Sequence, residues 1–127
     1  MTKNLDKEGL RSIADGYQLF YIDLWGVVHN GLELHSEAIN TLKQITKMNK
    51  DYVLLTNAPR PNSSVRKFLE KLGMEKSIRD HVFTSGEAAL NYLNKNFLND
   101  FFFHIGPPRD FDLFKDFEKN KVNDINK

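Results

Sequence analysis

The alternation of short apolar runs with longer amphipathic segments constrains the fold of this chain most strongly. Two runs, Tyr17–Asp23 and Asp51–Thr56, are rich in aromatic and β-branched residues, which is typical of strands. Between them, Ser36 can cap a helix of about three turns whose apolar residues recur at helical spacing. Strands alternating with helices predict βα units. We therefore expect an α/β fold, a Rossmann-like parallel sheet flanked by helices, in which Asp51–Thr56 is buried on both faces.

The same pattern continues in the second half of the sequence. Prolines at 59 and 61 interrupt it, because a proline disfavours helix in the residue before it. A helix should restart near Asn62 or Ser63, bury Val65, Phe68, Leu69 and Leu72, and end at Gly73. The later predicted elements are a short strand at His81–Thr84, a helix capped by Ser85, a buried strand at Phe101–Ile105, and a helical start at Asp110 that frays into a polar tail.

Composition limits the classes of partner. The chain has 127 residues, of which 40% are hydrophobic and 28% charged, as expected for one small globular domain. The net charge of +1 argues against nucleic acid or an anionic membrane as a partner. The absence of cysteine excludes disulfides and thiol catalysis. No apolar run approaches the roughly 20 residues of a membrane-spanning helix, so we expect a cytoplasmic protein.

A candidate nucleophile lies at the end of the first predicted strand. Asp23 follows an apolar run and precedes a loop with two glycines, which suits a rigidly held, exposed carboxylate that attacks a substrate. An aspartate in such a place is more often a turn or cap residue. The second strand ends at Thr56-Asn57, and ligands of parallel sheets bind beyond the carboxyl ends of the strands. A hydroxyl and an amide there could hold phosphoryl oxygens.

Several stretches, taken in order, resemble a known family. FYIDLWGVVHNG, VLLTNAPRP, KLGM and VFTSGEAAL, spread over residues 17–106, resemble the haloacid dehalogenase superfamily of hydrolases, in the subfamily of p-nitrophenyl phosphatase and phosphoglycolate phosphatase-like proteins. The resemblance implies that Asp23 attacks phosphorus and becomes an aspartyl-phosphate. It also implies that Mg²⁺ binds to the Asp23 carboxylate and the backbone carbonyl of Trp25.

The resemblance assigns further roles around the phosphate. The Thr56 hydroxyl would bind the phosphoryl group, and the Asn57 amide would help to orient it. Gly26 would let the loop turn and approach the phosphate, and Arg60 could meet a phosphate, although a surface role beside two prolines is the simpler interpretation. The implied activity is Mg²⁺-dependent hydrolysis of a small phosphate monoester, with a small phosphorylated metabolite as substrate.

The sequence departs from the family pattern in two ways. The family's first motif has a second aspartate, the general acid and base, at the position of Trp25. Loss of such a group typically costs roughly 10²–10⁴-fold in rate, which argues against efficient monoester hydrolysis. Family members also continue through a substrate-selecting cap domain, a lysine and a late acidic motif. None of these is visible after Gly106, where Asp110, Asp112 and Asp116 are predicted to form a solvated helix face.

We therefore interpret residues 1–106 as the N-terminal part of a core domain and residues 107–127 as a truncated approach to the cap region. Two alternatives remain open. The chain could be a catalytically silent remnant or binding module, or one half of a split enzyme. In the second case a complementing chain, or another copy of this one, would pair with an open sheet edge.

The histidines lack metal-ligand spacing. We predict ordinary packing or surface roles for His35, His81 and His104. His29 lies in the loop after Asp23 and could face a substrate. Ser85-Gly86-Glu87 is interpreted as a helix start and not as a catalytic serine.

Overall fold

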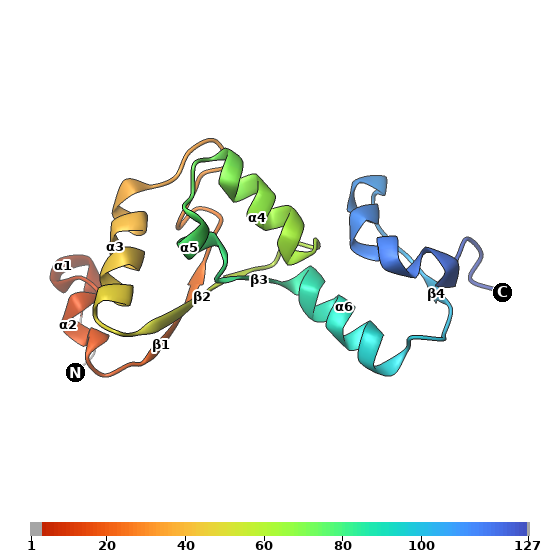
Figure 1. The fold of residues 1–127 in the computed structure, drawn as a ribbon, viewed down its shortest axis with the longest axis horizontal. Helices are drawn as coiled ribbons and strands as arrows, with labels where there is room; N and C mark the ends of the chain where they lie inside the picture. Colours follow the sequence, from red (N-terminus) through yellow and green to blue (C-terminus); the bar gives the residue numbers. More distant parts are fainter. Residues whose placement is uncertain (1–3, 127) are drawn as a thin grey trace. The chain divides into compact units, whose positions relative to one another are not determined.

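The computed structural model contains a three-stranded parallel sheet flanked by helices (Figure 1). The structure describes residues 4–126, without the side chains of Arg109 and Phe111. The strands are β1 (Leu19–Asp23), β2 (Asp51–Thr56) and β3 (Val82–Thr84), in the order β1-β2-β3. This confirms the predicted α/β class. By its internal contacts the chain divides within β2 into two units, residues 1–54 and 55–127.

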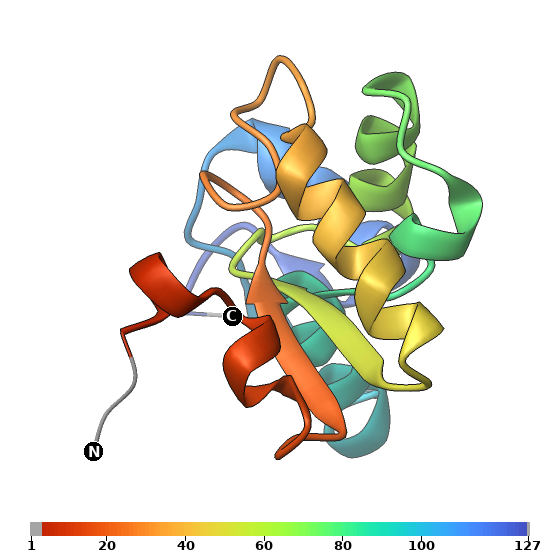
Figure 2. The same cartoon turned by 90° about the vertical axis from the view of Figure 1, so that its left-hand side faces the viewer.

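The first unit packs one long helix on two strands. Its helices are α1 (Leu5–Glu8), α2 (Arg11–Ala14) and α3 (Ser36–Lys47). Helix α3 covers one face of β1 and β2 (Figures 1 and 2), with Leu42 and Ile45 of the helix and Tyr52 and Leu54 of β2 buried. The strand starts are joined by the Asp51 amide, which donates to the Gln18 carbonyl at 2.9 Å.

The second unit holds the remaining elements. They are α4 (Asn62–Lys71), α5 (Lys76–Arg79), β3, α6 (Ser85–Asn96), β4 (Phe102–Phe103), the 3₁₀ helix η1 (Pro108–Asn120) and β5 (Lys121–Val122). Strands β4 and β5 form a separate two-stranded parallel sheet, with Phe102 opposite Lys121. The tail that we predicted to fray thus contributes a strand, because residues 121–122 pair with β4.

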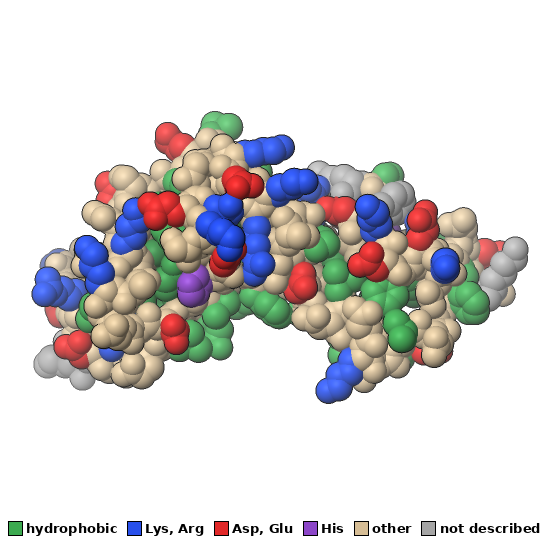
Figure 3. Space-filling model, viewed as in Figure 1, with side chains coloured by type: hydrophobic (Ala, Val, Ile, Leu, Met, Phe, Trp, Pro, Cys, Tyr) green, Lys and Arg blue, Asp and Glu red, His purple; other side chains and the backbone are tan. Residues whose placement is uncertain are grey.

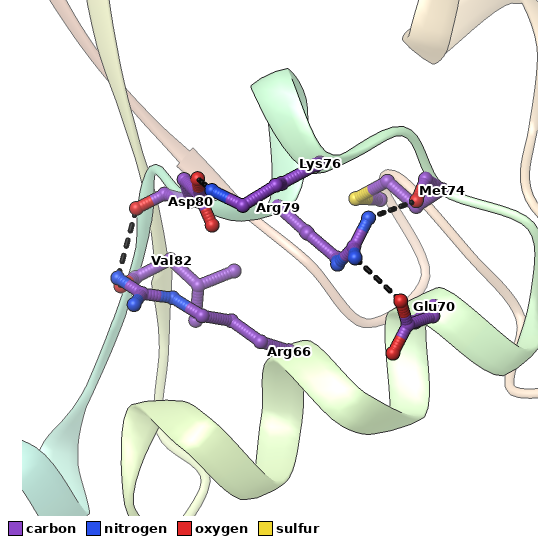
Figure 4. Close-up of polar contacts among 7 residues, drawn as sticks. All are labelled: Arg66, Glu70, Met74, Lys76, Arg79, Asp80 and Val82. Carbon is purple, nitrogen blue, oxygen red and sulfur yellow. Dashed lines mark hydrogen bonds and ion pairs between the residues drawn. The ribbon is translucent and has the colours of Figure 1, made fainter.

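Two arginines fasten the turns around α5 (Figure 4). Arg66 on α4 donates through Nη2 to the Asp80 carbonyl at 2.8 Å. Arg79 donates through Nη1 to the Met74 carbonyl at 3.0 Å and through Nη2 to Glu70 at 2.5 Å. These bonds satisfy carbonyls at helix and turn ends that would otherwise need water. Basic and acidic side chains are mixed over α4 and α5 (Figure 3), so this surface does not carry charge of one sign.

Both predicted helix caps are wrong by one residue. Ser36 is the first residue of α3, and its hydroxyl donates to the Glu37 carboxylate, while His35 occupies the cap position. Ser85 is likewise the first residue of α6. The cap is Thr84, whose extended backbone (φ −109°, ψ 155°) lets Oγ1 accept from the Glu87 amide at 2.9 Å. Each of these two helices therefore begins one residue earlier than the sequence indicated.

Several predictions of burial are also wrong. In β2, Tyr52 and Leu54 are buried but Leu55 is 44% exposed, so the strand is covered on one face and not on both. Phe101 is 71% exposed, and the predicted buried strand shrinks to Phe102–Phe103. Phe68 lies outside the buried stripe of α4. An apolar pattern indicates which side chains can be buried. Among the described residues, only some of these side chains are buried by other parts of the fold.

One further finding concerns membranes. Within residues 4–126, every helix is too short or too polar to span a lipid bilayer.

Candidate functional site

Asp23 is the last residue of β1, and its side chain is exposed. The backbone amide of Leu24 donates to Asp23 Oδ1 at 2.8 Å. Leu24 is itself 1% exposed, so the residue that follows the carboxylate is anchored in the core. A strand on one side and a buried leucine on the other hold the carboxylate rigidly at the surface, as the sequence interpretation requires.

The loop after Asp23 is a compact turn. The Leu24 carbonyl accepts from the amides of Val28 at 2.8 Å and His29 at 3.2 Å. Gly26 has φ +76°, in the left-handed region, and its amide donates to the His29 carbonyl at 2.8 Å. A side chain at this position would be strained whatever the space around it. The turn itself therefore requires Gly26, and whether the loop also approaches a phosphate stays a prediction.

His29 is the interior residue of this loop. Only 4% of it is exposed, and Nδ1 accepts from the Gly31 amide at 3.0 Å. Burial lowers the pKa of His29 below 6.5, nearby His35 lowers it further, and the Asp23 carboxylate partly offsets both effects. The neutral form is thus favoured, and His29 packs within the loop instead of presenting itself to solvent.

Trp25 lies between Asp23 and His29 in the sequence and, unlike His29, is exposed. Its side chain is 69% exposed, the largest exposure of any ring in the loop. The indole meets His29 edge-on, with ring centroids 6.5 Å apart and an interplanar angle of 68°. It also lies beside Gly31, where an added Cβ would be 3.8 Å from the indole Cζ2. The ring is therefore supported on one side and open to solvent over most of its surface.

The second unit contains a loop that is held in a different way. Thr56 ends β2, Asn57 follows it and is exposed, and the chain then runs to Pro61 before α4. The Ala58 carbonyl accepts from the Gly86 amide at 3.1 Å and from Ser85 Oγ at 3.0 Å. We call residues Thr84–Glu87, together with Asn62, the clamp, because they bind this loop at several points.

The clamp continues toward the start of α4. Thr84 Oγ1 donates to the Arg60 carbonyl at 2.5 Å, and the Thr84 amide donates to Asn62 Oδ1 at 2.9 Å. The Asn62 amide donates in turn to Glu87 Oε2 at 2.9 Å. The backbone groups of Arg60, Asn62 and Thr84 named here are thereby paired with side chains and do not need water as a partner. The loop after β2 is fixed by the start of α6.

Gly86 makes the clamp possible. A Cβ at this position would lie 2.4 Å from the Arg60 nitrogen and 2.5 Å from its carbonyl oxygen, distances that no side chain tolerates. Sequence reasoning missed this role and treated residues 85–87 only as a helix start. Two signals were present: a glycine inside a helix needs a packing reason, and Thr84 followed three residues later by Glu87 has capping-box spacing.

The predicted substrate residues fall into two groups. Asp23, Trp25 and Gly26 belong to the first unit, in one turn. Thr56, Asn57 and Arg60 belong to the second unit, where the clamp holds the Arg60 backbone. The roles that the sequence assigned to these side chains remain predictions.

A metal site is only partly provided by these residues. The Asp23 carboxylate and the Trp25 carbonyl are oxygen donors, the kind that Mg²⁺ prefers. Mg²⁺ takes six oxygen ligands, and among residues 4–126 there is no group of three or more acidic, histidine or cysteine side chains that could hold a metal ion. The donor type fits Mg²⁺, and these two groups would leave most of its coordination positions to water.

The fold and the two loops define an α/β protein of the Rossmann-like class, with polar residues at the ends of β1 and β2. Comparison with known families is more specific. The sequence model of the haloacid dehalogenase-like hydrolases matches residues 20–118, and the chain belongs to this family. No curated protein matches the chain significantly.

Solved structures agree with this assignment. A haloacid dehalogenase-like hydrolase from Brucella suis 1330 is 30% identical, with a TM-score of 0.70 over 84% of this chain and 38% of that one. A 4-nitrophenylphosphatase from Thermotoga maritima is 25% identical, with a TM-score of 0.67 over 82% and 40%. The p-nitrophenyl phosphatase from Archaeoglobus fulgidus, 16% identical with a TM-score of 0.65, shows the fold alone. The chain spans about two fifths of the length of these structures.

Proposed function

We propose that this chain carries the nucleophile of a phosphohydrolase, with Asp23 as the attacking residue. The observation that carries the proposal is the setting of Asp23: an exposed carboxylate that ends β1, anchored by buried Leu24 and followed by the Gly26 turn. Membership of a hydrolase family supports it, as does the similarity to a 4-nitrophenylphosphatase. For phosphoryl transfer, a protein mainly needs to provide a positioned nucleophile and fixed hydrogen-bond donors.

The proposed reaction has two steps. Asp23 Oδ1 already accepts from the Leu24 amide, so we assign the attack on phosphorus to Oδ2. As the new oxygen–phosphorus bond forms, the bond to the alcohol oxygen breaks and the alcohol leaves with the electron pair, taking a proton from water. A water molecule then attacks the phosphorus of the aspartyl-phosphate. This attack releases phosphate and restores the carboxylate.

Residues at the end of β2 are assigned to the phosphoryl oxygens. The Thr56 hydroxyl and the Asn57 amide are donors of the right kind, and Arg60 adds a positive charge that suits a phosphate. The clamp fixes the backbone of this loop, which would limit the entropy lost when a ligand binds. When bound at Asp23 and the Trp25 carbonyl, Mg²⁺ would neutralise negative charge on the phosphoryl group.

The test is release of phosphate from p-nitrophenyl phosphate by the purified chain, with and without Mg²⁺. We expect Asp23→Asn to reduce the rate by more than about 1,000-fold, because it removes the nucleophile. Asp116→Asn, an exposed aspartate on η1, is the matched control and should release phosphate at the parent rate. Equal rates for parent and Asp23→Asn, or no release by a folded chain, would contradict the proposal.

Phosphate binding without turnover is the second candidate function. It is favoured by the incomplete metal donor set among residues 4–126 and by the indole at position 25. Calorimetric titration with inorganic phosphate separates the two functions. Binding that Asn57→Ala weakens, together with no release of phosphate from any ester, would favour the binding module.

A further inference from the structure

An open cavity of about 370 Å³, here called the α4 cavity, lies beside helix α4 in the second unit. It is lined by one face of α4 and by the end of α5, through Ser63, Ser64, Arg66, Lys67, Glu70 and Arg79. Its volume falls within the range of about 300–1,000 Å³ that is typical of small-molecule sites. None of the residues proposed to act on the phosphoryl group lines it, so it is a second candidate site.

The lining of the α4 cavity carries an excess of positive charge. Its one carboxylate, Glu70, accepts from Arg79 Nη2 at 2.5 Å, so these two charges offset each other (Figure 4). Arg66 and Lys67 make no ion pair with any residue that the structure describes. Two positive charges on adjacent residues are therefore left without a neighbouring counter-charge in the lining.

Two acidic side chains near this lining are already engaged. The Asp80 carboxylate accepts from the Lys76 ammonium, and Asp112 Oδ2 accepts from Ser64 Oγ at 3.0 Å. Neither carboxylate lines the α4 cavity. Acidic and basic side chains are thus mixed over the surface of α4 and α5, while the cavity itself offers unpaired positive charge to a ligand.

The Arg66 guanidinium is held in place but has donors to spare. Its Nη2 donates to the Asp80 carbonyl at 2.8 Å and to the Val82 carbonyl at 3.4 Å. Its Nε is buried without an acceptor, and no described residue accepts from Nη1. A guanidinium that backbone carbonyls already orient can bind an oxyanion with little loss of side-chain freedom.

We infer that the α4 cavity binds a phosphate group through Arg66 and Lys67, with the exposed Ser63 hydroxyl as a further donor. A phosphate carries nearly two negative charges at neutral pH, which matches the two unpaired cations, whereas a single carboxylate carries one. Free phosphate and a small phosphate ester share this chemistry. The inference concerns binding alone and does not rest on the proposed function of Asp23.

The first test is calorimetric titration with inorganic phosphate, without Mg²⁺ and at constant ionic strength. Lys67→Gln is the informative variant, because Arg66→Gln would also remove the bonds to the Asp80 and Val82 carbonyls. We expect Lys67→Gln to weaken binding about fivefold, as for an exposed ion pair. Lys71→Gln, which removes an exposed lysine of α4 outside the lining, is the matched control and should keep the parent affinity.

Three results of this titration would overturn the inference: no binding by the parent chain, equal affinities for the parent and Lys67→Gln, or equal losses in Lys67→Gln and Lys71→Gln. The Asn57→Ala chain separates this site from the proposed hydrolytic one. Binding that Asn57→Ala weakens and Lys67→Gln does not would support the site at the end of β2 and overturn the α4 cavity. Phosphate binding that depends on Lys67 would support the cavity whether or not any ester is hydrolysed.

Stability provides a second readout, because a ligand that binds only the folded chain stabilises it. When phosphate replaces chloride at constant ionic strength, the urea midpoint should rise more in the parent and Lys71→Gln than in Lys67→Gln. Phosphate also stabilises proteins without binding to a site. An equal rise in all three chains would show this general effect alone and would overturn the inference.

Comparison of ligands identifies the source of the phosphate group. Glycerol 3-phosphate that binds more tightly than inorganic phosphate, with the same dependence on Lys67, would assign the α4 cavity to a phosphate ester. Tighter binding of inorganic phosphate would assign it to the free ion. Glycerol, which lacks the phosphate group, should not bind, and glycerol binding as tight as that of the ester would overturn the inference.

Discussion

The loops that follow β1 and β2 are held in place by different means. In the loop after β1, the bonding partners lie within the loop itself: Leu24 accepts from Val28 and His29, and the His35 amide donates to the Val28 carbonyl at 2.8 Å. In the loop after β2 and at the start of α4, the partners are 22 to 28 positions further along the chain, in residues Thr84–Glu87 of the clamp. The hydrogen bonds named for the first loop are therefore local in the sequence, whereas those of the second loop require the end of β3 and the start of α6.

This difference implies different responses to damage. A change in the first loop should stay local, because the backbone hydrogen bonds from Val28, His29 and His35 close within the loop. A change in the clamp should affect the loop after β2, β3 and the start of α6 together. Four measurements test this difference between the two loops.

The largest effect is expected for Gly86→Ala. The added Cβ would lie 2.4 Å from the Arg60 nitrogen, and backbone cannot move aside as a flexible side chain can. We expect a loss of about 3 kcal/mol in the free energy of unfolding, measured by urea denaturation. Gly16→Ala is the control, since its Cβ would meet the Ile13 carbonyl oxygen at an ordinary 3.5 Å. If the two variants were equally stable, the clamp would not depend on close backbone contact.

Thr84→Val should have the next largest effect. Thr84 is completely buried, and its hydroxyl both donates to Arg60 and accepts from Glu87, so valine leaves two backbone groups without this partner. We expect a loss of about 2 kcal/mol in the free energy of unfolding, and a smaller loss for Thr84→Ser, which keeps the hydroxyl. The emission of Trp25 in the folded state should stay unchanged in both variants. A shift in that emission would show that the two loops are coupled.

The stability of the chain should fall as the pH drops below about 6.5. Burial holds the pKa of His29 in the folded state below the 6.5 of an exposed histidine. Between these two values the unfolded chain binds the additional proton, so acid favours unfolding. Urea midpoints at about pH 7.5 and about pH 5.5 should differ less in His29→Asn than in the parent. An unchanged difference would assign the acid sensitivity to another group.

The smallest effect is expected for Asn30→Ala. Asn30 Oδ1 accepts from the amides of Leu32 and Glu33, both at 2.9 Å, but the residue is exposed and water can replace it. We expect a loss of about 0.5 kcal/mol, with Asn30→Asp close to the parent because it keeps the acceptor. A loss as large as that of Thr84→Val would show that the first loop also depends on a cooperative network.

The same comparison explains which features the sequence could predict. Strand β2 begins and ends where the apolar run begins and ends, and the helix before it was expected at its observed place, because both signals are local. The exposed end position of Asp23 and the turn at Gly26 follow from the same kind of signal. The exposure of Leu55 and Phe101 could not be predicted, since burial depends on what the rest of the fold places over a side chain.

The clamp could not be predicted from the sequence, for a related reason. A hydrogen bond links Thr84 to Asn62, and no periodicity or motif in either segment indicates it. Which residues of a parallel α/β fold meet across its connections depends on the three-dimensional path of the chain. The family resemblance identified which stretches matter, and the structure showed that VFTSGEAAL supports the loop of VLLTNAPRP.

The close approach at Gly86 also constrains which substitutions the chain can accumulate during evolution. All three short distances are to backbone atoms of Arg60, which every residue type possesses. The contact therefore places no restriction on the side chain at position 60, whereas any side chain at position 86 would clash with this backbone. Two residues that touch are thus subject to unequal selection, and the stricter selection falls on the one without a side chain.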